Sequence, residues 1–220
     1  MSAHREGAVH RAEPATNQAL HLARSARRRD LVVIAGSAGS VQALLEIVAA
    51  LPPDFETPVA IVLHRTPTPP RVLDGLLARR SKLRVVEAVA GDAITPRTVF
   101  VAPPHFHLSV RPDRTFAVED GRRIDHLRSS ANPLFESAAE IFGAGVVGVV
   151  LSGSGSNGAR GVAAIKKHGG TVLVQNQATC AYFEMPSAAI QTGAVDFVLP
   201  VDEIASALVV LCTPPVAAAG

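Results

Sequence analysis

Several features that would point to a specialised class of protein are missing from this sequence. Its 220 residues include no tryptophan, one tyrosine and only two cysteines, Cys180 and Cys212. Two cysteines form at most one disulfide, and neither has a neighbour at the spacing of metal ligands. We therefore expect two buried thiols, and neither a disulfide-stapled scaffold nor a metal site.

Long apolar runs are missing as well. No run approaches the roughly 20 uncharged residues that span a bilayer, and the N-terminus lacks the apolar segment of a secretory signal. Hydrophobic residues nevertheless make up 48% of the chain, which is enough for one sizeable core. We expect a globular protein of the cytoplasm that does not insert into a membrane.

A strong charge of one sign is also missing from most of the chain. The formal net charge is +2, and six arginines against three acidic residues place +3 within the first thirty residues, which leaves −1 for the rest. Such a balance gives no electrostatic footprint for nucleic acid. We expect a basic, flexible tail over residues 1–30, a globular domain over 31–212 and a frayed end over 213–220. Alternatively, the tail is a docking arm for an acidic partner.

What the sequence does contain is a regular alternation of valine- and isoleucine-rich runs with stretches of helical periodicity. This alternation is typical of α/β folds with a mostly parallel sheet. The predicted strands are Leu31–Ile34, Val59–Leu63, Leu83–Glu87, Val99–Ala102, Val146–Leu151 and Thr171–Gln175. The predicted helices are Ser40–Ala50, Arg71–Arg80, Pro133–Phe142, Gly158–His168 and Pro186–Thr192. We predict a doubly wound sheet with helices on both faces and an inserted antiparallel hairpin made of His107–Val110 and Thr115–Val118.

Three polar places come directly after predicted strands, where ligands collect in open α/β sheets. Ser37 follows the first strand, His64 follows the second, and the glycine-rich stretch Ser152–Gly158 follows the fifth. We expect all three to meet at one edge of the sheet.

Ser37 lies in a small-residue turn between a strand and a helix, which exposes its hydroxyl beside the free N–H groups of that helix. A serine becomes a nucleophile when a base accepts its proton, and histidine suits that task near neutral pH. His64 is the candidate base. Two alternatives stay open: the turn cradles a phosphate, although it lacks the lysine of a P-loop, or His64 only caps its strand.

The stretch Ser152–Gly158 allows a close backbone approach to a substrate, so that the N–H of Ser154 can stabilise negative charge. Asn157 either caps the next helix or accepts a hydrogen bond from the imidazole of His64. His105 and His107 have the alternate spacing of a metal pair, but no third ligand is near, so we expect structural roles for both.

Six ordered segments resemble the catalytic domain of the chemotaxis protein-glutamate methylesterases, the CheB family. They are IAGSAGS (34–40), LHRTP (63–67), GDAITPRTVFVAPPHFHL (91–108), LFESAAEIFG (134–143), VVGVVLSGSGSNGARG (146–161) and VLVQNQATCAYFEMPSAAI (172–190). The resemblance runs from residue 31 to about residue 204. It implies a doubly wound α/β domain that needs no cofactor and hydrolyses the γ-glutamyl methyl esters of chemoreceptors, in some members also deamidating glutamines.

The resemblance also implies roles for individual residues. The family's nucleophile falls on Ser37 and its general base on His64, whereas the aspartate that completes the triad is replaced by Asn157. The oxyanion hole falls on the N–H groups of Ala38 and Ser154. Met185 matches a substrate-binding position.

Other residues near the expected site depart from the family pattern. Ala38 stands where the family usually has a hydroxyl, Ser154 replaces a methionine, Asn132 an aspartate and Glu184 a glycine. A neutral Asn157 can orient a histidine but gives an imidazolium less electrostatic help than a carboxylate. We expect an esterase with a Ser-His-Asn variant of the triad. The alternatives are a catalytically impaired binding or regulatory module and an esterase for another acyl substrate.

The expected partners are the methylated cytoplasmic domains of chemoreceptors or a similar signalling protein. Family members usually carry a receiver domain before the esterase, and thirty residues cannot form one, so we expect regulation by that route to be absent. The Asn157-Gly158 step adds the hypothesis that slow deamidation regenerates an aspartate.

Overall fold

The centre of the molecule is a parallel sheet whose inner strands are buried on both faces. This computed structural model describes residues 18–20, 23, 29–64, 72–120 and 129–213, and within them seven parallel strands form one sheet in the order β3-β4-β2-β1-β7-β8-β9. The strands are β1 (Leu31–Gly36), β2 (Val59–Leu63), β3 (Arg84–Glu87), β4 (Thr98–Val101), β7 (Val146–Val150), β8 (Thr171–Gln175) and β9 (Phe197–Leu199). Every residue of β1, β2, β4, β7 and β8 is buried, which explains their continuous apolar sequences.

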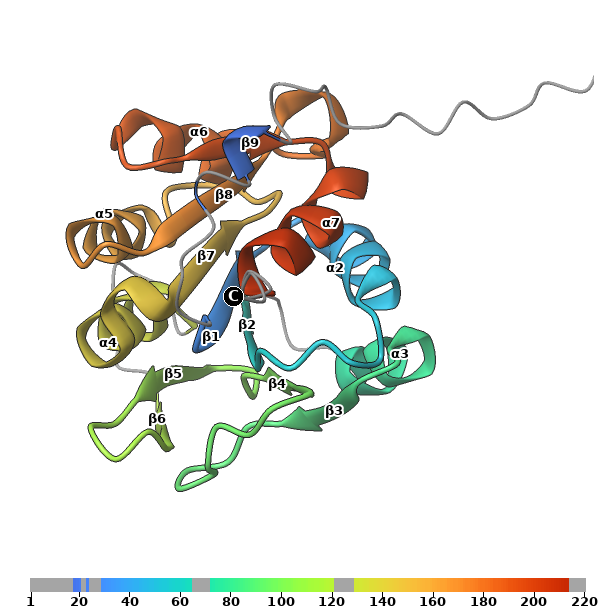
Figure 1. Ribbon diagram of the computed structural model, residues 1–220, viewed down its shortest axis with the longest axis vertical. Coiled ribbons are helices and arrows are strands. Elements are labelled where there is room, and N and C mark those ends of the chain that lie inside the picture. The colour runs from blue at the N-terminus through green and yellow to red at the C-terminus, as the bar shows by residue number, and fades with distance from the viewer. Residues whose placement is uncertain (1–17, 21–22, 24–28, 65–71, 121–128, 214–220) are drawn as a thin grey trace, which may run out of the picture.

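Helices cover both faces of the sheet. Figure 1 shows α2 (Ser40–Ala50), α3 (Val72–Arg80) and α7 (Val201–Cys212) on one face, and α4 (Asn132–Phe142), α5 (Ala159–Lys167) and α6 (Glu184–Gln191) on the other. Alternate residues of β1 enter the two cores: Val32 and Ile34 pack on the α2 side, and Val33 and Ala35 on the α4 side. No helix in the described part of the chain has both the length and the apolar character required to cross a membrane. The predicted doubly wound α/β fold is confirmed.

The inserted hairpin is also confirmed. β5 (Phe106–Val110) and β6 (Phe116–Asp120) pair antiparallel, with Leu108 opposite Val118. Its apolar face packs on the main domain, since Phe116 is fully buried and its ring meets that of Phe100 edge-on at 5.0 Å. The Val110 N–H donates to Ser137 Oγ at 2.9 Å, which ties the hairpin to α4.

The order of the strands fixes where a ligand can approach. β1 pairs with β2 on one side and with β7 on the other. From β1, the strands β2, β4 and β3 follow toward one edge of the sheet, and β7, β8 and β9 follow toward the other. The connections that leave the carboxyl ends of β1 and β7 run to opposite faces of the sheet, α2 on one and α5 on the other. The crevice between two such ends is the usual ligand site of open α/β sheets.

Two elements lie outside the predicted set, and two parts of the predicted tail pack on the domain. β9 and α7 complete one edge of the sheet and one helical layer. Leu20 is buried in the core on the α2 side, and the buried Arg29 donates to the Ala144 carbonyl and, at 2.9 Å, to Thr171 Oγ1. Residues 1–17, 21–22 and 24–28 of the predicted tail, and the end from residue 214, lie outside the described residues.

The two cysteines are free thiols, with Cys212 buried and Cys180 half-buried. Desolvation raises the pKa of the Cys180 thiol to about 11, so at pH 8 only about one molecule in a thousand carries the reactive thiolate. We expect both thiols of the folded protein to react with iodoacetamide at pH 8 much more slowly than those of the urea-unfolded chain. Mass spectrometry measures the extent of alkylation over time. Equal rates for the folded and the unfolded protein would contradict this expectation.

Candidate active site

Ser37 and His64 lie side by side because their strands are neighbours. Gly36, the last residue of β1, is in register with Leu63, the last of β2, and the next N–H, that of His64, donates to the Gly36 carbonyl at 3.0 Å. Ser37 Oγ then lies 3.5 Å from His64 Nδ1 and donates to the His64 carbonyl at 3.2 Å. The separation from the imidazole is long for a hydrogen bond, as is common at unliganded catalytic pairs.

The turn that carries Ser37 accepts only very small residues on either side. Gly39 has a φ of 76°, and a Cβ there would lie 2.5 Å from the Cβ of Ala181. At Gly36 a Cβ would lie 2.5 Å from Ser40 Oγ, which donates to the Ser37 carbonyl at 2.7 Å. These contacts bend the chain sharply from strand to helix and leave the side chain of Ser37 partly exposed.

The segment after β7 holds the turn that carries Ser37 through hydrogen bonds. The Ser37 N–H donates to the Ser152 carbonyl at 3.0 Å, and Ser152 Oγ donates to the Ala38 carbonyl at 2.9 Å. The same Ser152 Oγ accepts from the Tyr182 N–H at 3.0 Å, and the Met185 N–H donates to the Gly153 carbonyl at 2.9 Å. The nucleophile turn, the end of β7 and the start of α6 are therefore one hydrogen-bonded unit.

Gly153 sits at the tightest point of this unit, which makes its replacement a test of the packing. A Cβ there would lie 2.2 Å from Met185 Sδ and 2.8 Å from the Cβ of Ser37. We expect Gly153→Ala to lower the free energy of unfolding by about 1–3 kcal/mol, a loss of several degrees in Tm. Thermal unfolding followed by circular dichroism measures the change.

Gly75→Ala is the matched control for this substitution. Gly75 lies within α3, and a Cβ there would have nothing within 4 Å. Alanine favours a helix over glycine, so the control should gain about 0.5–1 kcal/mol. Equal Tm values for the two variants would show that the position of Gly153 is not crowded.

Two backbone N–H groups beside Ser37 have no hydrogen-bond partner in the part of the chain that the structure describes. Neither the N–H of Ala38 nor that of Ser154 makes a hydrogen bond with any described residue, and both residues are exposed. Ala38 lies two residues before the start of α2, whose N-cap is Gly39, and Ser154 follows Gly153 in the loop before α5. Such donors are suited to stabilise an oxyanion that forms on a carbonyl attacked by Ser37.

Asn157 is placed differently from both expectations for it. The residue that caps α5 is Gly158, without a side-chain bond, and no hydrogen bond among the described residues joins Asn157 to His64. Its Oδ1 instead accepts from the Ala131 N–H at 2.8 Å and from Ser130 Oγ at 3.3 Å. Asn157 is buried, with 5% of its surface exposed. Its amide is therefore held inside the protein by the segment that leads into α4.

Several polar groups around Asn157 were not anticipated as members of one network. His107 is buried, and its Nδ1 accepts from the Ser130 N–H at 3.1 Å. Ser129 Oγ accepts from the His105 N–H at 3.0 Å, and Asn132 Oδ1 accepts from the Gly161 N–H at 3.0 Å. Neighbouring serine and asparagine residues at 129–132 are the only sequence signal for this network. Among the described residues no three side chains form a metal site.

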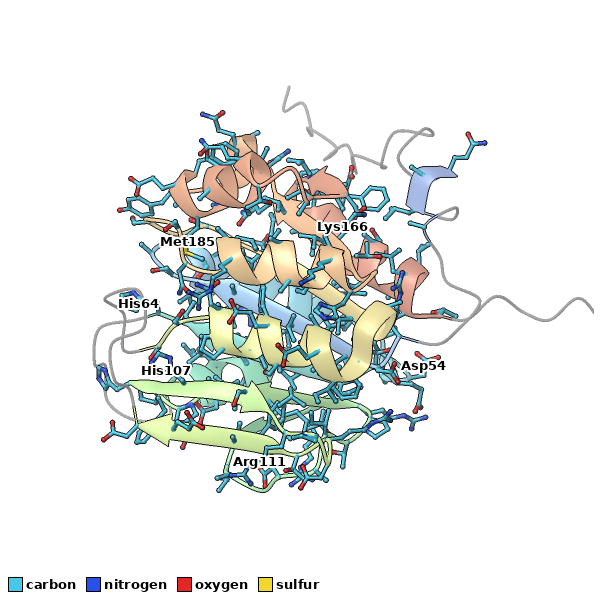
Figure 2. All side chains as sticks on the ribbon, turned by 90° about the vertical axis from the view of Figure 1, so that its left-hand side faces the viewer. Asp54, His64, His107, Arg111, Lys166 and Met185 are labelled. Atoms are coloured by element: carbon cyan, nitrogen blue, oxygen red, sulfur yellow. The ribbon has the colours of Figure 1, made fainter. Side chains whose placement is uncertain are left out.

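Two of the proposed site residues, His64 and Met185, lie on one side of the molecule. Figure 2 shows His64, Met185 and His107 along the side where the parallel strands end, with Asp54 on the opposite side. Met185 is buried, with only 1% of its surface exposed, and it lies against Gly153, whose other neighbour is the Cβ of Ser37. It therefore forms the floor beneath the nucleophile rather than an exposed wall.

Comparison with known proteins shows the family of this chain. The family model described as CheB methylesterase matches residues 32–208. A protein-glutamate methylesterase/protein-glutamine glutaminase of Anaeromyxobacter dehalogenans is 44% identical over 83% of this chain and 53% of its own length. A putative enzyme of the same name from Leptospira interrogans is 35% identical over 80% of this chain and 91% of its own length.

A solved structure of the same family has a similar fold. The catalytic domain of the Thermotoga maritima CheB methylesterase superimposes with a TM-score of 0.79 at 32% identity, over 83% of this chain and 98% of that domain. The chain spans about half the length of the Anaeromyxobacter and Caulobacter relatives it matches, with 53% and 52% of each covered. This chain belongs to the CheB methylesterase family.

Proposed function

We propose that this chain is a serine esterase that hydrolyses the γ-glutamyl methyl esters of chemoreceptors. The observation that carries the proposal is the pairing of Ser37 Oγ with His64 Nδ1 at 3.5 Å, beside the unpartnered N–H groups of Ala38 and Ser154. A nucleophile, a base and oxyanion donors at one crevice are the parts that acyl transfer requires. The names of the relatives supply the substrate class.

The reaction follows from these positions in two steps. Ser37 Oγ forms a bond to the ester carbonyl carbon while its proton passes to His64 Nδ1, and the carbonyl oxygen becomes an oxyanion facing the N–H groups of Ala38 and Ser154. The oxyanion collapses, and methanol leaves with the proton from His64. A water molecule, deprotonated by His64, then attacks the glutamyl-serine ester and releases glutamate and free Ser37.

The same acyl-enzyme forms from a glutamine side chain when ammonia is the leaving group, so we extend the proposal to receptor glutamines. The partner is then a methylated cytoplasmic domain of a chemoreceptor or a similar signalling protein, and the protein works in the cytoplasm. Neither reaction requires a cofactor.

Methanol release tests the proposal directly. The purified chain is incubated with methylated receptor, or with a peptide that contains a γ-glutamyl methyl ester, and methanol is measured over time. We expect methanol to appear in proportion to enzyme concentration. Release no faster than with heat-denatured protein would refute the esterase.

A second candidate function is a binding module with greatly reduced turnover. It is favoured by the placement of Asn157, whose oxygen is already used by Ala131 and Ser130 and makes no hydrogen bond with His64. In that case the receptor would still bind to the crevice, but the imidazolium of His64 would form too rarely for rapid hydrolysis. Substitution of Asn157, described below, separates the two functions.

A further inference from the structure

Glu184 makes an unusual contact with the loop that carries the Ser154 N–H. It is the first residue of α6, and its Oε2 accepts a hydrogen bond from the Gly155 N–H at 2.8 Å. On the other side of Ser154, the Met185 N–H donates to the Gly153 carbonyl at 2.9 Å. The start of α6 therefore holds the loop on both sides of Ser154, once through the backbone and once through a carboxylate.

The carboxylate of Glu184 has no other charged side chain in the described segments around it. Within the described segments next to Ser37, which are residues 37–40, 64, 152–158 and 181–185, Glu184 is the only Asp, Glu, Lys or Arg. It makes no ion pair with a described residue and it is exposed. The first turns of α2, α4 and α5, which also begin near the crevice, contain no acidic residue. Within these described segments, therefore, a substrate at Ser37 meets one negative charge and no cation; Arg160, in the first turn of α5, is paired with Glu136.

A half-exposed aromatic ring lies against the turn that carries Ser37. Tyr182 is 50% exposed, and its Cδ2 would lie 3.2 Å from a Cβ placed at Gly39, so the ring lies against the nucleophile turn. The face of an aromatic ring attracts a cation more than an anion, and the Glu184 carboxylate has the same preference. Both side chains therefore discriminate by charge in the same direction.

We propose that Glu184 sets the charge preference of this site, so that glutamyl esters flanked by basic residues are preferred over those flanked by acidic residues. The proposal rests on the esterase function and names the substrate class within it. A cation of the substrate is attracted to the exposed carboxylate. An acidic neighbour is repelled, and the Gly155 N–H that would receive it is already occupied.

The experiment compares two peptides that differ only beside the glutamyl methyl ester, where one has lysines and the other glutamates. For the wild-type protein we expect kcat/KM to be about tenfold higher with the lysine peptide at low salt, and the ratio to fall as salt is raised. Glu184→Gln keeps an oxygen for the Gly155 N–H but removes the charge, and it should bring the ratio to about threefold or less. Glu140→Gln removes an exposed charge from α4 and should leave the ratio at its wild-type value.

Binding of the same peptides separates this proposal from the proposed function. Their Kd values are measured by fluorescence anisotropy with the Ser37→Ala protein, with and without Glu184→Gln, so that no turnover is needed. A preference for the lysine peptide that Glu184→Gln removes supports the role of Glu184, even if the wild-type protein releases no methanol and the esterase is refuted. Equal binding of the two peptides, binding of neither, or a preference that Glu184→Gln leaves intact overturns it.

Discussion

Ser37→Ala should lower kcat/KM for methyl-ester hydrolysis by about 10³-fold or more, equivalent to about 4 kcal/mol of transition-state stabilisation. The reason is that Ser37 carries the hydroxyl beside His64, whereas two neighbouring described hydroxyls are engaged: Ser40 Oγ donates to the Ser37 carbonyl and Ser152 Oγ to the Ala38 carbonyl. The fold should be preserved, because the Ser37 side chain is only half-buried and its bonds are long, at 3.2 and 3.5 Å. Methanol release and thermal unfolding measure the two effects.

Ser206→Ala is the control for this loss. Ser206 is an exposed serine of α7 whose hydroxyl donates only to the Glu203 carbonyl, at 2.8 Å. We expect wild-type activity from it, and a change in the free energy of unfolding below about 1 kcal/mol in both variants. If Ser37→Ala retains the wild-type rate, Ser37 is not the nucleophile, and the phosphate-cradle interpretation of the turn becomes the stronger one.

Asn157→Asp should raise kcat by about 10²-fold. A buried carboxylate stabilises the imidazolium that forms on His64 during attack, whereas a neutral amide does not; in serine proteases the change from Asp to Asn costs about 10⁴ in kcat. We expect a smaller effect here because Asn157 makes no hydrogen bond with His64 and its Oδ1 is held by Ala131 and Ser130. The carboxylate would stabilise the imidazolium of His64 by electrostatic attraction across a distance rather than through a direct hydrogen bond.

The same substitution has an opposite effect on stability. The Asn157 amide donates to the Ser129 carbonyl at 3.5 Å, and a carboxylate oxygen in that place would face another acceptor. We expect a loss of about 1 kcal/mol in the free energy of unfolding together with the gain in rate. Because the Asn157-Gly158 step is prone to deamidation, the wild-type reference is first checked by mass spectrometry for an intact amide.

Asn157→Ala completes the comparison. It removes the acceptor of the buried Ala131 N–H and should destabilise the protein by about 1–3 kcal/mol without any gain in rate. If Asn157→Asp is no faster than the wild type, the amide serves only to anchor the segment before α4, and the binding-module function is favoured.

The inner strands of this fold can be predicted from sequence because burial on both faces leaves a continuous apolar run. β2 and β8 have the expected bounds, and β1, β4 and β7 differ from them by one or two residues. β9 has only three residues, of which one is buried, so its run is too short to stand out. α7 could have been found, since Asp202 and Glu203 in its first turn precede buried residues at helical spacing.

The candidate site divides in the same way. Ser37 and His64 could be placed together because each directly follows a strand, and neighbouring parallel strands end at one edge. The environment of Asn157 could not be placed, because its partners are 26 to 28 positions away and reach it only through the packing of α4 against α5. Local sequence offered a helix cap or a triad member; Gly158 is the residue that caps α5, and the triad role of Asn157 stays a prediction.

The pairing of β1 with β7 has a consequence for the order of biosynthesis. Ala38 and Ser152 are 114 positions apart, and the strand between β2 and β7 in the sheet is the first one made. While the ribosome is still translating the region before β7, one edge of the fully buried strand β1 has no partner. Long-range parallel pairing forms slowly and leaves such edges open to aggregation. The crevice at Ser37 is thus completed only after Met185 has emerged, so a nascent chain acquires its chemistry only once the segment that carries α6 has been made.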